Sequence, residues 1–284
     1  YKKPMTLGPV LGSCGLAMMI PPSAIGVILA YVAQISVARV LIGGIIPGLM
    51  MAILYATYII IRCRLQPSLA PVYEAPPIPL SEKLKSIVRD ILPFGFIVFM
   101  VTGTILVGVA TPSEASAFGA LSTFVLAAAY RSLNWQAVKA AFAGTLNTTV
   151  MILMIFTGSA AFSQILAYSG ATRGMVELAV TLPVNPIVLL IGTQIVVLFM
   201  GMFMEQLSIL MITLPIFMPL CGVLGWDPLW FGLMMLINMG IANLSPPFGV
   251  LLFVMKGVSP PDTTMGDIYR AAIPFVIMDF IVIL

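Results

Sequence analysis

Two pairs of adjacent prolines stand inside apolar stretches of this chain, each with a serine beside it. The first is Ile20-Pro21-Pro22-Ser23 and the second is Leu244-Ser245-Pro246-Pro247. Proline removes a backbone donor and frees a carbonyl one turn earlier in a helix. Carbonyl and hydroxyl oxygens are hard ligands suited to a cation such as sodium, and a helix N-terminus favours an anion. The structural alternative is a plain proline kink.

Further polar residues extend this candidate site. Glu205 stands in a long apolar stretch, where an ionisable group is costly unless it is paired or hydrated, so it is either functional or a helix cap. Asn238 could serve the second proline pair, and Asp279 would face another helix or a partner subunit. The sodium- or substrate-binding candidates are Ser13, Pro21, Pro22, Ser23, Glu205, Asn243, Ser245, Pro246, Pro247 and Gly249.

Several chemistries are excluded by residues that the sequence lacks. It has no histidine, which removes His-ligated haem and zinc and histidine general bases. Cys14, Cys63 and Cys221 match no metal-ligand spacing, and Cys14 and Cys221 fit buried free thiols. There is no P-loop for ATP and no basic patch for nucleic acid. We therefore expect no enzyme, no catalytic residue and no cofactor, and no metal other than sodium at the broken helices.

The composition requires lipid as a solvent. Of 284 residues, 61% are hydrophobic and 8% are charged, whereas soluble domains carry about 25% charged residues. Only helices and closed barrels satisfy their backbone in lipid, and the long unbroken apolar runs favour helices. The fold class is therefore an all-α integral membrane protein. The two broken stretches run in opposite directions across the membrane, which is typical of an inverted-repeat secondary transporter.

Basic residues predict the orientation. Residues 62–91 form a polar, proline-rich loop that ends in a short amphipathic helix, and we place this loop in the cytoplasm. Counting crossings from it leaves only Arg39 and Arg173 outside. Residues 131–146 are expected to form a separate surface helix anchored by Trp135, followed by a span at 147–169.

The stretch 186–223 turns without a basic loop, so we expect a re-entrant hairpin with Glu205 near its tip; two full spans are the alternative. The stretch 229–256 is expected to be a broken helix. Thr111-Pro112-Ser113-Glu114 fits a capping box, with a structural role in the core as the alternative for Glu114. Asp227 should cap the helix after it.

Several stretches together resemble the large membrane (M) subunit of tripartite ATP-independent periplasmic (TRAP) transporters, the DctM-like family. They occur in the family's order over nearly the whole chain. They are Met19–Ser23, Gly43 to Pro47-Gly48-Leu49, Gly108–Ala115, Gly201–Glu205, Leu214-Pro215-Ile216, Gly225–Pro228 and Ser245–Gly249. Two departures are Gly15-Leu16-Ala17-Met18-Met19, where many members are glycine-rich, and Ser245, where many have threonine.

The resemblance implies a fold of the ion-transporter superfamily and an elevator-type motion. Residues 1–61 would be the second half of a first inverted repeat and 92–284 the second repeat, and an N-terminal part would be missing. It implies sodium-coupled uptake of a small organic anion, such as a C4-dicarboxylate, across the bacterial inner membrane. Its partners would be a periplasmic substrate-binding protein and a small membrane subunit (Q type).

Other functions remain alternatives. A stand-alone sodium–dicarboxylate symporter shares the hairpin and broken-helix design but needs no binding protein. An assembly subunit would show no sodium dependence. A channel would need a filter motif, and an intramembrane protease would need serine with histidine or paired aspartates; neither pattern is present.

Overall fold

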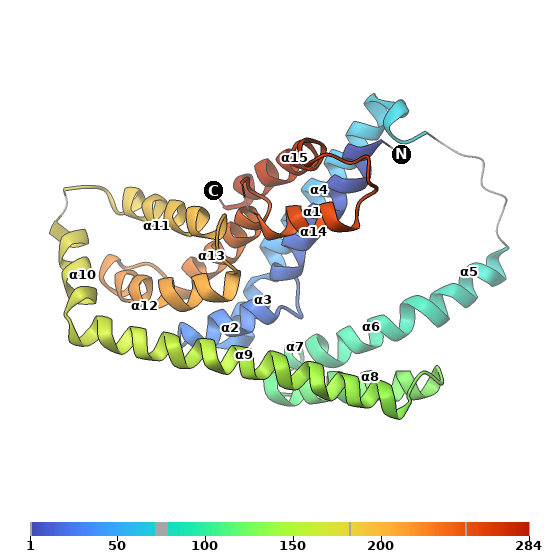
Figure 1. Ribbon diagram of the computed structural model, residues 1–284, viewed down its shortest axis with the longest axis horizontal. Helices are drawn as coiled ribbons and strands as arrows, with labels where there is room; N and C mark the ends of the chain where they lie inside the picture. Colours follow the sequence, from blue (N-terminus) through green and yellow to red (C-terminus); the bar gives the residue numbers. More distant parts are fainter. Residues whose placement is uncertain (1, 72–78, 182, 248, 284) are drawn as a thin grey trace. The chain divides into compact units, whose positions relative to one another are not determined.

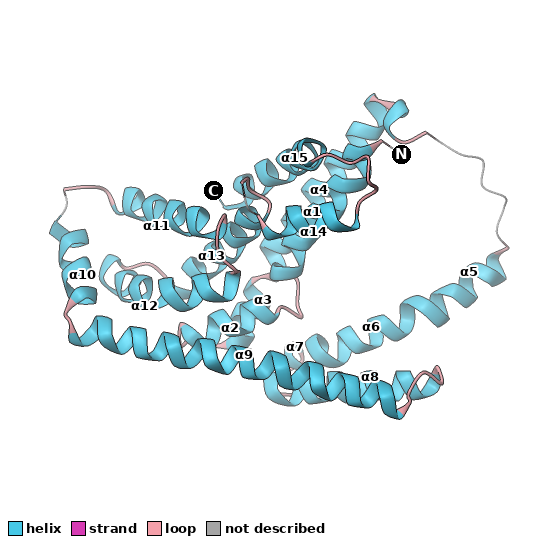
Figure 2. Cartoon of the chain, viewed as in Figure 1, coloured by secondary structure: helices cyan, strands magenta, loops and turns pink. Residues whose placement is uncertain are grey.

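Helices make up all the regular structure in the residues that the computed structural model describes, which are 2–71, 79–181, 183–247 and 249–283 (Figure 2). This is the all-helical architecture expected from the composition. The chain divides into two compact units, Tyr1–Val72 with Gly158–Leu284 as unit 1 and Tyr73–Thr157 as unit 2. Helix α9 (Trp135–Tyr168) begins in unit 2 and ends in unit 1.

Unit 1 contains both double prolines and the Glu205 stretch (Figure 1). Besides the end of α9, its elements are α1 (Lys3–Met19), α2 (Ala24–Val32), α3 (Val37–Gly43), α4 (Ile45–Leu65), the 3-10 turn η1 (Pro67–Leu69), α10 (Ala171–Thr181), α11 (Pro186–Gly201), α12 (Gln206–Leu224), α13 (Pro228–Asn243), α14 (Val250–Val258) and α15 (Met265–Ile283).

The core of unit 1 forms around α13, which packs against α1, α11 and α15. Small residues allow the helices to approach closely, as is usual where lipid supplies no hydrophobic drive for association. The ring of Phe275 on α15 packs over Gly8 and Gly12 of α1, where a Cβ at Gly12 would stand 2.3 Å from the ring. In the same way, a Cβ at Gly201 of α11 would stand 2.3 Å from the side chain of Ala242 on α13.

Three helical stretches are long and apolar enough to cross a membrane, namely Val37–Leu65, Trp135–Tyr168 and Gln206–Leu224. A fourth follows if α1 and α2, which are bent by 40° at their break, form one broken span; α11 and α13 are shorter apolar helices. Large apolar side chains stay exposed on the surface, such as Ile46 at 69% and Phe94 at 70%. Such a surface fits lipid and not water.

Unit 2 is a chain of shorter elements that leads into α9. They are α5 (Leu80–Ser86), the π-helical turn η2 (Ile87–Ile91), α6 (Leu92–Val98), the π-helical turn η3 (Phe99–Gly103), α7 (Thr104–Leu106) and α8 (Pro112–Ala129). The hydroxyl of Thr111 accepts from the backbone N–H of Glu114, and the Glu114 carboxylate accepts from the backbone N–H of Thr111 at 2.8 Å. This capping box starts α8, whose first residue is Pro112.

The prediction of a separate surface helix at 131–146 is wrong. One continuous helix of 34 residues runs from Trp135 to Tyr168. Residues 136–146 contain no proline and only one glycine, Gly144, so nothing stops the helix before the apolar part begins. Part of the predicted cytoplasmic loop, residues 72–78, lies outside the described residues.

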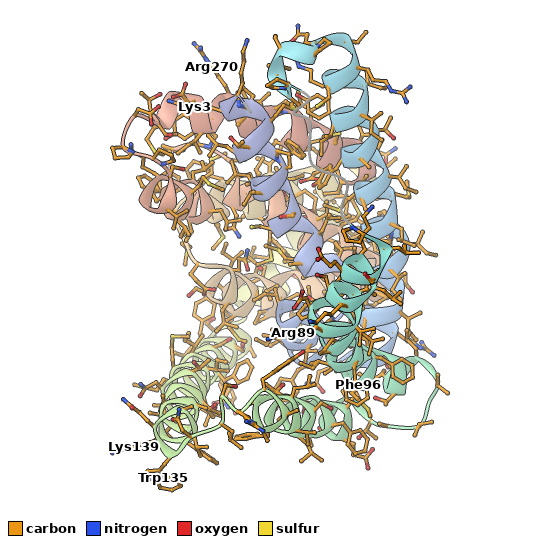
Figure 3. The ribbon with its side chains drawn as sticks, turned by 90° about the vertical axis from the view of Figure 1, so that its right-hand side faces the viewer. Lys3, Arg89, Phe96, Trp135, Lys139 and Arg270 are labelled. Atoms are coloured by element: carbon orange, nitrogen blue, oxygen red, sulfur yellow. The ribbon has the colours of Figure 1, made fainter. Side chains whose placement is uncertain are left out.

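Basic residues that the topology places on one side also gather at one end of unit 1. The backbone N–H of Lys2 donates to the carbonyl of Leu69 at 2.9 Å, so the start of α1 lies beside the turn that follows α4. Lys3 and Arg270 project near each other (Figure 3). Lys3 Nζ contacts carboxylate oxygens of Asp262 at 2.9 Å and Asp267 at 3.3 Å. In unit 2, Trp135 and Lys139 project from the beginning of α9 (Figure 3).

Candidate functional site

The first double proline ends α1 and starts α2. Ser23 is the N-cap of α2: its hydroxyl accepts from the N–H of Gly26 at 3.1 Å and donates to the carbonyl of Met18 at 2.6 Å. The side chain is buried. Because proline supplies no N–H, the serine hydroxyl takes over a carbonyl that a continuous helix would have bonded.

The second double proline separates α13 from α14 in a similar way. The Ser245 hydroxyl donates to the carbonyl of Ile241 at 2.8 Å and is buried. Gly249 lies so close to the end of α13 that a Cβ there would stand 2.4 Å from the carbonyl oxygen of Asn243. Gly249 precedes α14 and makes no side-chain cap hydrogen bond. The Pro–Pro peptide bond is cis in both breaks.

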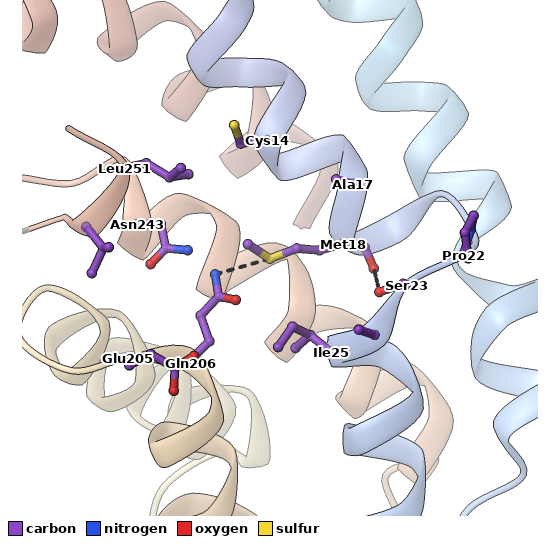
Figure 4. Close-up of a pocket in the computed structure, with 12 residues that line it drawn as sticks. Cys14, Ala17, Met18, Pro22, Ser23, Ile25, Glu205, Gln206, Asn243 and Leu251 are labelled. Carbon is purple, nitrogen blue, oxygen red and sulfur yellow. Dashed lines mark hydrogen bonds between the residues drawn. The ribbon is translucent and has the colours of Figure 1, made fainter. Parts of the chain in front are cut away.

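A cavity of about 470 Å³ lies next to both breaks (Figure 4). Its walls come from the end of α1, the start of α2, the start of α12, the end of α13 and the start of α14. The residues that line it are Cys14, Ala17, Met18, Pro22, Ser23, Ala24, Ile25, Glu205, Gln206, Asn243, Val250 and Leu251.

Three helices begin at this cavity. Its lining includes the first residues of α2 (Ala24, Ile25), of α12 (Gln206) and of α14 (Val250, Leu251). The N-terminus of a helix carries partial positive charge and unsatisfied N–H groups. Among the described residues that line the cavity there is no lysine or arginine. Any positive potential along the described lining therefore comes from helix N-termini and not from basic side chains.

The three helix starts are capped differently. Ser23 gives α2 a neutral cap, whereas Glu205 gives α12 a charged one: its carboxylate accepts from the N–H of Leu207 at 2.9 Å. Helix α14 has only the bare backbone of Gly249. The neighbouring Gln206 reaches across the cavity, with its amide nitrogen 3.6 Å from the sulfur of Met18 (Figure 4).

The candidates predicted from sequence divide into two groups. Pro22, Ser23, Glu205 and Asn243 line the cavity together, although they come from three separate parts of the chain. The others do not line it. Ser13 is exposed on α1 and donates to the carbonyl of Val10 one turn earlier. The remaining candidates belong to the two helix breaks and do not line the cavity; they are Pro21, Ser245, Pro246, Pro247 and Gly249.

Two polar residues have other surroundings than expected. Asn238, predicted near the second double proline, donates instead to the backbone carbonyl and side-chain oxygen of Gln194, at 2.6 and 3.0 Å, and so joins α13 to α11. Cys14, expected to be buried, is half-buried and lines the cavity. Asp227 accepts from the N–H of Trp230 at 2.8 Å and caps α13.

The sequence reasoning missed Met18 and Gln206. Gln206 directly follows Glu205 in the chain, so its position beside a named candidate was a usable signal. Met18 carried none, because an apolar residue in an apolar helix gives no indication of which face meets a cavity. No cluster of three His, Cys, Asp or Glu side chains able to hold a metal occurs within the described ranges.

Comparison with known proteins covers the whole chain. Residues 1–284 match the family model described as the tripartite ATP-independent periplasmic transporter, DctM component. The C4-dicarboxylate TRAP transporter large permease protein of Pseudomonas aeruginosa is 30% identical over 281 residues, which cover 98% of this chain and 64% of the relative.

Other relatives carry different substrates in their names. The sialic acid TRAP transporter large permease protein of Vibrio cholerae is 30% identical, over 97% of this chain and 63% of the relative. The ectoine/5-hydroxyectoine TRAP transporter large permease protein of Ruegeria pomeroyi is 26% identical, over 98% and 64%. The chain thus spans a little less than two thirds of the length of these relatives.

Proposed function

The chain belongs to the DctM component family of TRAP transporters, and we propose that it is a large permease subunit that takes up a small organic carboxylate by secondary transport. The observation that carries the proposal is the cavity at which α2, α12 and α14 all begin. The relatives are transporter permeases and not enzymes, and the chain is a multi-pass protein of the bacterial inner membrane.

A carboxylate suits this cavity for physical reasons. Helix N-termini bind anions through oriented N–H groups and the helix dipole, and discontinuous helices present them near the middle of a membrane in secondary transporters. The amides of Asn243 and Gln206 add hydrogen-bond donors to the same wall. Because the Glu205 carboxylate places a negative charge at the start of α12, whereas the Ser23 cap of α2 is neutral, the substrate carboxylate is expected to lie nearer α2 and α14.

Sodium coupling is part of the proposal. The donor set at the breaks fits a hard monovalent cation, since it offers hydroxyls, an amide and backbone carbonyls, and no thiolate or imidazole cluster. At the second break the carbonyl oxygens of Asn243 and Ser245 both lie close to Gly249, where an added Cβ would stand 2.4 Å and 2.9 Å from them. Ser23, Asn243 and Ser245 would hold the ion, which would supply positive charge beside the bound anion.

The matched breaks also support an inverted-repeat architecture with elevator-type motion. In each, a helix ends, two prolines follow, and a helix of nine residues restarts: α2 after the first break and α14 after the second. We place the second half of the first repeat in 1–61 and the second repeat in 92–284. We also propose that α11 and α12, which meet at residues 202–205, form the re-entrant hairpin.

We further propose two protein partners, a periplasmic binding protein that delivers the substrate and a small membrane subunit. One relative, the isethionate TRAP transporter permease protein DctMQ of Oleidesulfovibrio alaskensis, is 25% identical over 100% of this chain and 44% of its own length. Its name joins the M and Q components. The family does not favour a stand-alone sodium–dicarboxylate symporter, which is the alternative for the test.

The test is uptake in proteoliposomes that contain the full-length protein with its small subunit. Labelled organic acids are added with or without the binding protein and with or without an inward sodium gradient. We expect uptake only when the binding protein and the inward sodium gradient are both present. Uptake without the binding protein would favour the stand-alone symporter, and uptake that ignores sodium would refute sodium coupling.

Two alanine variants test whether the cavity is the substrate-binding site. Asn243→Ala removes a donor from the cavity wall, and we expect the substrate KM to rise about tenfold, since a hydrogen bond to a charged group contributes roughly 1.5–3 kcal/mol. Asn147→Ala is the matched control, because Asn147 is exposed on α9 and does not line the cavity. Equal KM values for the two variants would remove Asn243 from the site.

A further inference from the structure

Asp279 is a carboxyl group that the proposed transport site does not use. It lies on α15 with a side chain that is 0% exposed. One oxygen, Oδ1, accepts a hydrogen bond from the hydroxyl of Tyr55 on α4. The other, Oδ2, is buried and has no hydrogen-bond partner among the described residues. A buried polar atom without a partner is rare enough to require an explanation.

The surroundings of Oδ2 are apolar. It faces α1 at Gly15, where an added Cβ would stand 3.7 Å from Oδ2, 3.6 Å from the Tyr55 hydroxyl and 3.5 Å from the methyl group of Met51. One turn before Asp279, the ring of Phe275 packs edge-on against Tyr55 with centroids 5.0 Å apart. Met51, Tyr55 and Phe275 are all buried. This environment offers one neutral donor to the carboxyl group.

No basic side chain in the described part of the chain forms an ion pair with Asp279. Helix α13 has no titratable residue. On α1, Lys3 pairs with Asp262 and Asp267, and Cys14 lines the cavity; on α14, Lys256 donates to the carbonyl of Thr263. The remaining titratable residues of the helices packed against Asp279, and of α15 itself, are Tyr58, Arg62, Cys63, Arg64, Asp267, Tyr269 and Arg270.

A charged carboxylate in this apolar environment is strongly disfavoured, because burial removes the water that would solvate it and no described residue donates a hydrogen bond to Oδ2 in its place. A metal ion would need several oxygen ligands, and Tyr55 is the one oxygen donor bonded to Asp279. A proton needs a single oxygen. We propose that Asp279 is a buried proton-binding site, at which Oδ2 takes a proton from water while Tyr55 holds Oδ1.

The Asp279 site and the candidate transport cavity adjoin different residues of α1. Gly15 faces Asp279, while its neighbour Cys14 lines the cavity. Loss of the proton leaves a buried charge between α1, α4 and α15, and so disfavours the packing that shapes the cavity wall. The stability of unit 1 therefore falls as pH rises, because the unfolded carboxyl ionises freely in water and the buried one does not.

The experiment is infrared spectroscopy of the purified full-length protein in lipid nanodiscs. A protonated carboxylic acid has a C=O stretch above the amide I band that shifts in D₂O. We expect this band in the wild type, its loss in Asp279→Asn, and no change in Asp90→Asn, a matched control at an exposed aspartate. Tyr55→Phe should move the band to higher frequency, since Oδ1 loses its donor.

Thermal unfolding provides a second measurement. The midpoint of the wild type should fall from mildly acidic to alkaline pH more steeply than that of Asp279→Asn. If Asp279→Asn does not fold, the wild-type band must still disappear at the alkaline pH where its midpoint falls. A folded Asp279→Asn that retains the band would overturn the proposal, as would a wild-type band that appears only when sodium is removed. Neither measurement involves transport, so the outcome is independent of the proposed function.

Discussion

Gly249→Ala tests whether the second helix break shapes the transport cavity. A Cβ at this position would stand 2.4 Å from the carbonyl oxygen of Asn243 and 2.9 Å from that of Ser245, whereas real Cβ contacts essentially stop at 3.0 Å. Both obstacles are backbone atoms, so the start of α14 must move by about half an ångström or more. Overpacking of this kind costs about 1–3 kcal/mol.

The effect on transport should exceed the effect on stability. Misplacing a binding group by about 1 Å costs on the order of 100-fold in rate, so we expect uptake to fall by about 10- to 100-fold in proteoliposomes. Thermal unfolding of the purified protein measures the stability loss separately. Gly257→Ala is the matched control on the same helix: an added Cβ there meets no atom within 4 Å, and alanine favours a helix over glycine.

A single result would refute this reasoning. If Gly249→Ala transports at the rate of Gly257→Ala, the geometry of the break does not control the cavity. If Gly249→Ala merely unfolds, hydrogen exchange of α14 relative to α13 shows whether the damage starts at the break, as expected, or spreads from elsewhere.

Three further predictions concern packing, capping and pH. Gly12→Ala should destabilise unit 1 by about 1–3 kcal/mol in thermal unfolding, because its Cβ would stand 2.3 Å from the Phe275 ring. Thr111→Ala should cost α8 about 1 kcal/mol and speed hydrogen exchange in its first turn, since the capping box is lost. The hydrogen bond from Lys3 lowers the pKa of Asp262. The small stabilisation by this exposed ion pair is therefore present at neutral pH and lost as the pH falls through the lowered pKa. The Lys3→Met deficit in melting midpoint should therefore shrink in acid, where only the hydrogen bond from Lys3 Nζ to the backbone carbonyl of Asp262 is left.

Each of these has its own control. Gly222→Ala on α12 adds a methyl group where no atom lies within 4 Å, and an equal loss there would remove the steric explanation for Gly12. Thr111→Ser keeps a hydroxyl cap and should retain slow exchange. If Lys3→Met lowers the melting midpoint by the same amount in acid as at neutral pH, the ion pair with Asp262 does not contribute to stability.

The helix breaks were predictable because their cause is local. Two adjacent prolines remove two successive backbone N–H groups, so the ends of α1 and α13 were predictable at the double prolines. Single prolines do not end their helices here, since Pro9, Pro215, Pro219 and Pro274 lie inside α1, α12 and α15. The same reasoning failed at α9, where a change from polar to apolar composition was interpreted as a boundary. A change from polar to apolar residues alters which part of a helix faces lipid, but it does not end the helix, as the continuous α9 shows.

The contents of the cavity were only partly predictable. Polar residues in apolar stretches are conspicuous, which is why Ser23, Glu205 and Asn243 could be named. The face of α1 that meets the cavity depends on packing against α13 and α15, so the sequence could not show that Cys14, and not the predicted Ser13, lines the cavity. The same holds for Asp279, whose hydrogen-bond partner Tyr55 lies 224 positions away in the chain.

Glu205 shows that a helix-capping role and a role in a binding site are compatible, because it caps α12 and also lines the cavity. A free carboxylate would repel the anionic substrate that we propose for this cavity, but the Glu205 carboxylate accepts a hydrogen bond from the N–H of Leu207 on α12. It therefore matches the positive end of one helix with a negative charge of the protein's own. The helices that restart after the double prolines have a neutral cap or none. In the proposed function, a substrate carboxylate would therefore approach two helix starts that carry no matching negative charge, those of α2 and α14, and each of these helices follows a double-proline break.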